Sequence, residues 1–78
     1  KYLNMSSYYT VSFNGKNVIN IIDLRKNAII NRFSFQGTLM NGPIVVGDRC
    51  TIVTKNGNKH QGLVIKLPSG SVVDRFTA

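Results

Sequence analysis

The side chains that could bind a soft metal ion are few. Cys50 and His60 are the only cysteine and the only histidine in the sequence, and they lie ten positions apart. A structural zinc site uses four such ligands and a catalytic site three, so this pair predicts no metal centre. Cys50 lies among β-branched residues, where a cysteine is typical as a small packing residue, and a single cysteine excludes an internal disulfide.

The sequence also contains few residues suited to nucleophilic or acid–base catalysis. Ser7, His60 and Asp23 are the residue types of a hydrolytic triad, but no motif holds them in order. The three aspartates are widely separated and there is no glutamate, so no pair of carboxylates is available for acid–base catalysis. Asp23 precedes a predicted turn, where an aspartate typically accepts backbone N–H hydrogen bonds. We therefore expect no catalytic, cofactor-binding or metal-binding residues and no cofactor, and we interpret the chain as non-enzymatic.

Two features could bind anions or nucleic acid. Asn14-Gly15-Lys16 resembles a phosphate loop in composition, but a hairpin turn is the favoured interpretation. Tyr8, Tyr9 and Phe13 could stack on single-stranded bases, but packing between sheets is the favoured interpretation for them. The net charge of +7 is compatible with nucleic acid, an anionic membrane surface or an acidic protein. Because the charges are spread along the chain, as on an ordinary solvated surface, nucleic acid is not the partner we expect.

The elements that must position these side chains are all predicted to be β-strands. β-Branched and aromatic residues dominate short segments separated by turn residues, and no segment has the 3.6-residue period of a helix. Asn14-Gly15 and Asn56-Gly57 predict type I′ hairpin turns, in which both central residues take positive φ. Other turns are predicted at Gly47-Asp48, Arg25-Lys26-Asn27 and Pro68-Ser69-Gly70. The predicted strands are residues 7–13, 17–24, 28–35, 42–47, 49–55, 60–67 and 71–77.

The sequence repeats itself once. A shift of 42 places Val11-Ser12-Phe13-Asn14-Gly15 on Val53-Thr54-Lys55-Asn56-Gly57. One inserted residue makes the shift 43, and Ile29-Ile30-Asn31-Arg32-Phe33 then falls on Val72-Val73-Asp74-Arg75-Phe76. A period in the low forties with about four strands per unit is typical of β-propeller blades.

The apolar pattern indicates that the sheets are stacked. Tyr9, Val11 and Phe13 alternate with polar residues, as in a strand with one buried face. Ile29-Ile30 and Ile44-Val45-Val46 instead place apolar side chains on both faces of their strands. We expect both faces of these strands to be covered, and we expect Pro43 at the start of a strand, where a missing N–H costs least.

A family resemblance rests on two longer stretches. Residues 42–57 contain a small residue and a proline, an apolar strand, a Gly-Asp turn, a second strand and a turn ending in glycine. Residues 62–76 continue with a strand, a turn ending in Gly70, and a strand ending in Phe76. This pattern resembles the repeat of PQQ-like β-propellers over about residues 9–77. The chain departs from it by offering Phe33 and Phe76 where family blades often end in Trp, and by retaining only Asp23 and Gly70 of the Asp-x-x-Thr-Gly turns.

The resemblance implies an all-β fold of two consecutive four-stranded antiparallel blades, as a fragment of a larger ring. Residues 1–37 would form a partial blade and residues 38–78 a blade, together one piece of a single propeller domain. The family includes propellers of the outer-membrane β-barrel assembly machinery, so the resemblance implies a periplasmic or outer-membrane-associated protein. Its implied partners are the remaining blades of the parent chain and proteins bound by the blade loops. No apolar run is long enough for a membrane-spanning helix.

Three functions follow from these observations. The first is a non-catalytic β-propeller scaffold segment that mediates protein–protein interaction, with outer-membrane protein assembly as the setting that the resemblance implies. The second is a fragment of a PQQ-dependent quinoprotein dehydrogenase, which the missing Trp and the few carboxylates oppose. The third sets the repeat aside and takes the chain as a small basic β-barrel that binds nucleic acid.

Overall fold

The described part of the chain consists of β-strands joined by short turns. The computed structural model describes residues 8–78, and these contain seven strands and no helix, which confirms the predicted all-β class. The strands are β1 (Tyr9–Phe13), β2 (Val18–Asp23), β3 (Ala28–Ser34), β4 (Thr38–Val46), β5 (Arg49–Asn56), β6 (Lys59–Lys66) and β7 (Val72–Thr77).

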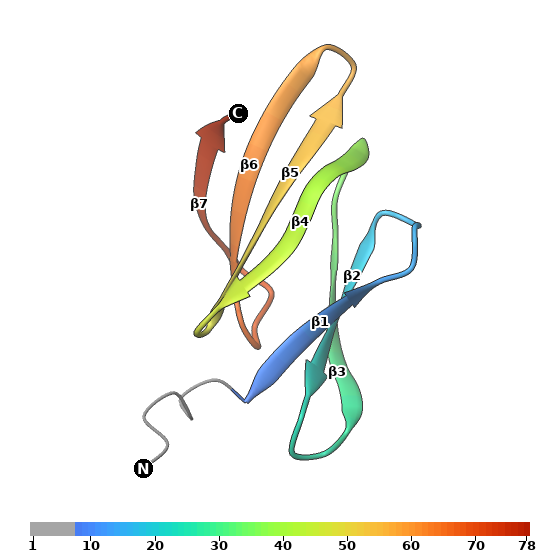
Figure 1. The fold of residues 1–78 in the computed structure, drawn as a ribbon, viewed down its shortest axis with the longest axis vertical. Helices are drawn as coiled ribbons and strands as arrows, with labels where there is room; N and C mark the ends of the chain where they lie inside the picture. Colours follow the sequence, from blue (N-terminus) through green and yellow to red (C-terminus); the bar gives the residue numbers. More distant parts are fainter. Residues whose placement is uncertain (1–7) are drawn as a thin grey trace.

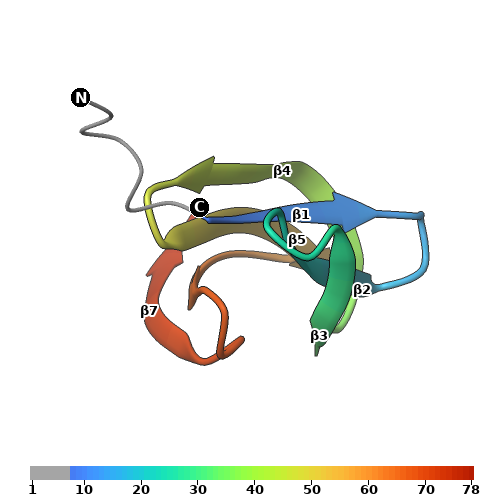
Figure 2. The same cartoon turned by 90° about the horizontal axis from the view of Figure 1, so that it is seen from below.

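The strands form two antiparallel sheets whose order follows the sequence. One sheet has the order β1-β2-β3 and the other β4-β5-β6-β7 (Figure 1). Figure 2 shows β1 and β4 on one side of the molecule, with β3 and β7 on the opposite side. The described residues therefore form sheets of three and four strands, and these two open sheets do not close a ring.

Two hairpins differ from the predicted type I′ turns. In the β5–β6 hairpin Asn56 pairs with Lys59, so the central turn residues are Gly57 and Asn58 rather than Asn56 and Gly57. Positive φ occurs at Gly57 and not at Asn58, whereas a type I′ turn needs it at both central residues. The β1–β2 hairpin has a longer connection over residues 14–17, with positive φ at Gly15 and Asn17. The positions of both hairpins were predicted correctly, but their turn type was wrong.

Strand β4 begins earlier than predicted. It starts at Thr38 rather than at residue 42, so Pro43 lies inside the strand and not at its start. The β4–β5 pairing is irregular here, because the register shifts between Asn41 and Ile44. Proline lacks the N–H that a regular ladder needs, and a bulge is one of the few strand positions that tolerates it.

The repeat detected in the sequence is present in the strand pairing. The β2–β3 ladder is interrupted by a bulge between Ile21 and Ile22, and the β6–β7 ladder by one between Val64 and Ile65. A shift of 43 residues carries the first bulge onto the second. The β1–β2 and β5–β6 ladders do not follow the predicted shift of 42. Ile21 and Val64 are counterparts, and Ile21 pairs with Val11 whereas Val64 pairs with Thr51. Val11 therefore corresponds to Thr51 and not to Val53, a displacement of two residues that leaves the side chain on the same face.

The hydrophobic core lies between the two sheets. Ile19 and Ile21 of β2 are buried in one cluster with side chains of β5 and β6. Tyr9, Val11 and Phe13 pack against this cluster, as their alternation predicted. The buried apolar side chains are Ile19, Ile21, Phe35, Cys50, Ile52, Leu63, Ile65 and Leu67.

A short connection fixes how the second sheet follows the first. Phe35 is buried, its backbone N–H donates to the Asn17 carbonyl at 3.0 Å, and its ring lies 6.0 Å from that of Phe13. Gly37 follows with a φ of +88°, and a β-carbon there would collide with the Lys55 backbone carbonyl. Only glycine fits this position, because both the backbone conformation and the available space exclude a side chain.

Candidate functional site

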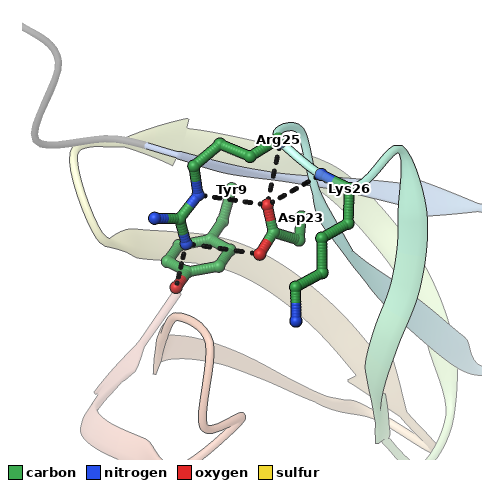
Figure 3. A network of polar contacts seen from close by, with 4 residues as sticks. All are labelled: Tyr9, Asp23, Arg25 and Lys26. Atoms are coloured by element: carbon green, nitrogen blue, oxygen red, sulfur yellow. Dashed lines mark hydrogen bonds and ion pairs between the residues drawn. The ribbon is translucent and has the colours of Figure 1, made fainter.

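Asp23, at the end of β2, forms the densest polar cluster among the described residues. Its Oδ1 accepts hydrogen bonds from the backbone N–H groups of Arg25 (2.8 Å) and Lys26 (3.3 Å), which confirms its predicted role in closing the turn (Figure 3). The Arg25 guanidinium also contacts both carboxylate oxygens at 3.3 Å and donates to the Tyr9 hydroxyl at 3.2 Å. Both carboxylate oxygens of Asp23 are engaged by donors within the fold, which indicates a structural role for the cluster.

The protonation of Asp23 reflects two opposing effects. Burial raises the pKa of its carboxyl group, whereas hydrogen bonds from the Arg25 side chain and from the backbone N–H groups of Arg25 and Lys26, together with the Arg25 charge, lower it. The second group of effects prevails, and the pKa lies below its ordinary value. Arg25 in turn has a raised pKa, because it donates to Asp23. Asp23 is therefore held ionised, which suits a turn clamp and not a general acid.

The residues considered for metal or nucleophilic chemistry are not brought together. Cys50 is buried on the face of β5 that faces the core, and burial raises the pKa of its thiol to about 11. His60 is exposed and pairs with Lys55, five positions further along the β5–β6 ladder and on the opposite face. Ser7 lies outside the described residues. Within residues 8–78, no three His, Cys, Asp or Glu side chains form a group that could hold a metal ion.

The aromatic residues near the start of β1 are engaged within the fold. Arg25 lies over the ring of Tyr8 at 4.3 Å and over that of Tyr9 at 5.7 Å. Phe13 packs against Phe35 and the core. Three rings that already contact other side chains do not form a free stacking platform for bases.

The four-stranded sheet has a partly apolar outer face, as the apolar run Ile44-Val45-Val46 indicated for both faces of its strand. The outer face is the face of this sheet that is turned away from the first sheet. On it, Ile44 and Val46 of β4 remain 54% and 75% exposed. We expected both faces of this strand to be covered, but the described residues cover only its inner face. The apolar side chains of the outer face are Ile44, Val46, Val53, Val64 and Phe76, with Thr51 among them, and the same face also carries Arg49, Lys55, His60, Lys66 and Asp74.

A groove opens between the sheets, at the end of the molecule where the β5–β6 turn lies. Its volume is about 1210 Å³. One wall is the inner face of β5, β6 and β7, which contributes Asn56, Gln61 and Leu63. The other wall is the end of β3 and the connection that follows it, residues 33–36. No single sequence motif marks this groove, because its residues come from three separate stretches of the chain, within residues 33–36, 54–63 and 72–78.

The groove has cationic side chains, Lys59 and Arg75, and no acidic ones among the described residues. Lys59, His60 and Arg75 line it, whereas Asp23, Asp48 and Asp74 do not. Asp74 pairs with Val64 and so lies on the outer face, while Arg75 pairs with Leu63 on the inner face. The ion pairs of the described residues involve Arg25, Arg49 and Lys66, so Lys59 and Arg75 have no carboxylate partner among them. The groove is therefore electropositive.

Comparisons with family models, with curated proteins and with solved structures found no match. The described residues also contain no helix with the length and apolar character needed to cross a membrane.

Proposed function

We propose that this chain is a non-catalytic scaffold whose repeated sheets stack as blades of a β-propeller and hold their loops in fixed positions for protein partners. The observation that carries the proposal is a correspondence between faces. Surfaces that are buried in one repeat recur, at equivalent ladder positions, as exposed surfaces in the other.

The outer face of the second sheet corresponds to the buried face of the first. The shift of 43 that superimposes the two bulges carries Ile21 onto Val64 and Phe33 onto Phe76. Ile21 is fully buried between the sheets and Phe33 packs against the core, whereas Phe76 is exposed. The residues of the outer face are thus equivalent to residues that, in the first repeat, are covered by another sheet.

The same correspondence holds for the face of the first sheet that is turned away from the second sheet. Leu67, after β6, is 2% exposed and packs between the sheets, whereas its counterpart Leu24, after β2, is 56% exposed. The two leucines make equivalent hydrogen bonds, since the Leu24 N–H donates to the Tyr8 carbonyl and the Leu67 N–H to the Asp48 carbonyl. Each repeat therefore has one face for the unit before it and a different face for the unit after it.

Different complementary faces produce head-to-tail stacking, which yields a ring when the rotation between units closes. Stacked repeats bury a continuous core, so the strands become rigid and the turns are left to contact partners. The resemblance of residues 42–57 and 62–76 to PQQ-like repeats supports a propeller, and it is the sole support for a periplasmic, outer-membrane-assembly setting.

A tandem chain tests this proposal. Residues 36–78 would be appended directly after position 78, with Ala78→Phe in the first copy, because Ala78 occupies the position of the buried Phe35. If the added unit covers the outer face, the melting temperature should rise by about 5 °C or more, since each stacked interface adds stability.

The matched control is Phe76→Lys, made in the original 78 residues of the tandem chain and, separately, in the 78-residue chain alone. In the tandem chain this residue would face the new interface, so the substitution should cancel most of the gain. An unchanged melting temperature in the tandem chain, or an equal effect of Phe76→Lys in both chains, would contradict stacking on the outer face.

A further inference from the structure

We propose that the electropositive groove between the two sheets binds an extended acidic peptide segment that also carries apolar side chains. The inference names a partner class for the proposed scaffold and rests on it. The groove lies between the two sheets already present and meets the outer face at Phe76.

The groove offers two kinds of contact to such a peptide. Leu63 and Val72 of the four-stranded sheet and Phe33 of the first sheet supply apolar surface along its walls. Lys59 and Arg75 lie on the same face as Leu63, and neither has a carboxylate partner among the described residues. Apolar anchors with flanking carboxylates on the peptide would complement this arrangement, and arginine favours carboxylates through its paired donors.

Backbone hydrogen bonding is available at the rim. Among residues 8–78, β3 and β7 each pair with only one neighbouring strand, which leaves each with a free edge, and residues of both strands line the groove. An extended peptide can pair with such an edge while its alternate side chains point into the groove. Amide side chains of Asn56 and Gln61 in the groove add donors and acceptors for the peptide backbone.

The composition of the groove favours a peptide over nucleic acid. Binding to single strands depends on exposed aromatic rings on which bases stack. Three aromatic residues line the groove, and none presents a free ring face inside it. Phe35 is buried and Phe33 packs against the core, whereas the exposed ring of Phe76 lies on Gly62, on the outer face. The apolar side chains of the four-stranded sheet that face the groove from its inner face, Leu63 and Val72, are aliphatic and suit leucine-like anchors.

The test measures binding of the 78-residue chain to a fluorescein-labelled heptapeptide of alternating Asp and Leu, by fluorescence anisotropy. The comparison probes are the same peptide with Asn in place of Asp and a 12-nucleotide oligothymidylate. We expect the acidic peptide to bind most tightly, and the double variant Lys59→Gln with Arg75→Gln to weaken it by about fivefold to tenfold. Both residues are exposed at the rim, so this variant should keep the fold, which circular dichroism would check.

The charge-matched control is Lys16→Gln with Lys26→Gln, which removes two positive charges outside the groove and should change the affinity by about twofold or less because salt screens them. A second variant, Thr77→Glu, places a carboxylate in the groove and should also weaken binding. Equal losses in both double variants, equal binding of the Asn peptide, or tighter binding of the oligothymidylate would overturn the proposal. The tandem chain tests stacking without this peptide, so each proposal can fail alone.

Discussion

The ring of Phe76 lies directly on Gly62, across the β6–β7 ladder, in the space that a β-carbon would fill. Gly62→Ala should therefore displace the ring and destabilise the fold by about 1–2 kcal/mol, as expected for overpacking. In a Phe76→Ala background the same change should become neutral or stabilising, since alanine is better than glycine in a strand by about 0.5–1 kcal/mol. Urea unfolding of the four chains gives this double-mutant cycle. A coupling energy near zero would show that the ring does not depend on Gly62.

Ile52 and Ile44 allow the core to be compared with the outer face. Ile52 is fully buried, so Ile52→Ala should lower the free energy of unfolding by about 2–5 kcal/mol. Ile44→Ala removes the same atoms from an exposed position and should cost about 0.5 kcal/mol or less at concentrations where the chain is monomeric. Chemical denaturation measures both. Similar losses for the two variants would mean that the core is not where the structure places it.

Cys50 should be unreactive while the protein is folded. Burial raises the pKa of its thiol to about 11, so little thiolate is present at about pH 8, and the side chain is inaccessible to reagents. Iodoacetamide labelling followed by mass spectrometry should be slow for the native chain and fast in urea. Rapid labelling without denaturant would instead indicate that β5 opens easily.

Asp23 should make stability dependent on acid. Its pKa is lower in the folded chain than in the unfolded chain, so its stabilising contribution is fully present above the unfolded value and is lost as the pH falls through the folded value. Asp23→Asn should be less stable at neutral pH and should lose part of the acid dependence of the melting temperature. Asp74→Asn, at an exposed position, is the control for removing one carboxylate. The prediction fails if both variants show the same pH profile.

Asn31 joins the two sheets through its side chain. Its Nδ2 donates to the Pro68 carbonyl at 3.0 Å and to the Ser69 carbonyl at 2.9 Å, which links β3 to the turn between β6 and β7. Asn31→Ala should cost about 1–2 kcal/mol, the loss of two such bonds. Asn20→Ala, which removes a 3.4 Å contact with Ser12 within the first sheet, should cost less. Equal losses in urea unfolding would argue against a special role for the link between sheets.

Strand existence was predictable because the local signals agree. The alternation of Tyr9, Val11 and Phe13 and the turn residues around each segment specify strands without reference to the rest of the chain. The repeat also predicted which strands correspond. The start of β4 was not predictable, because Thr38 to Asn41 gain their pairing from β5, and Pro43 by its type predicts a strand boundary.

The turn register and the groove were beyond sequence reasoning for different reasons. Asn56-Gly57 is a strong turn signal, but a shift of one residue places Gly57 at the first central position, and glycine satisfies both arrangements. The groove depends on the angle between two sheets, which is set by packing around Phe35 and the glycine at position 37. Neither Phe35 nor the glycine at position 37 indicates a binding surface when only the sequence is considered. Asp23 was the exception, because an aspartate before a turn has a local role that needs no tertiary information.

The strand order has a consequence for how the chain acquires its structure. Every ladder joins strands that are consecutive in the sequence, and the connections between paired strands are short. Little loop entropy must therefore be lost before each hairpin forms, and hairpins of this kind form within microseconds. The slow event should be the docking of one preformed sheet on the other, when Ile21 and Ile52 leave water together. Substitutions between the sheets should then slow folding more than substitutions in the turns.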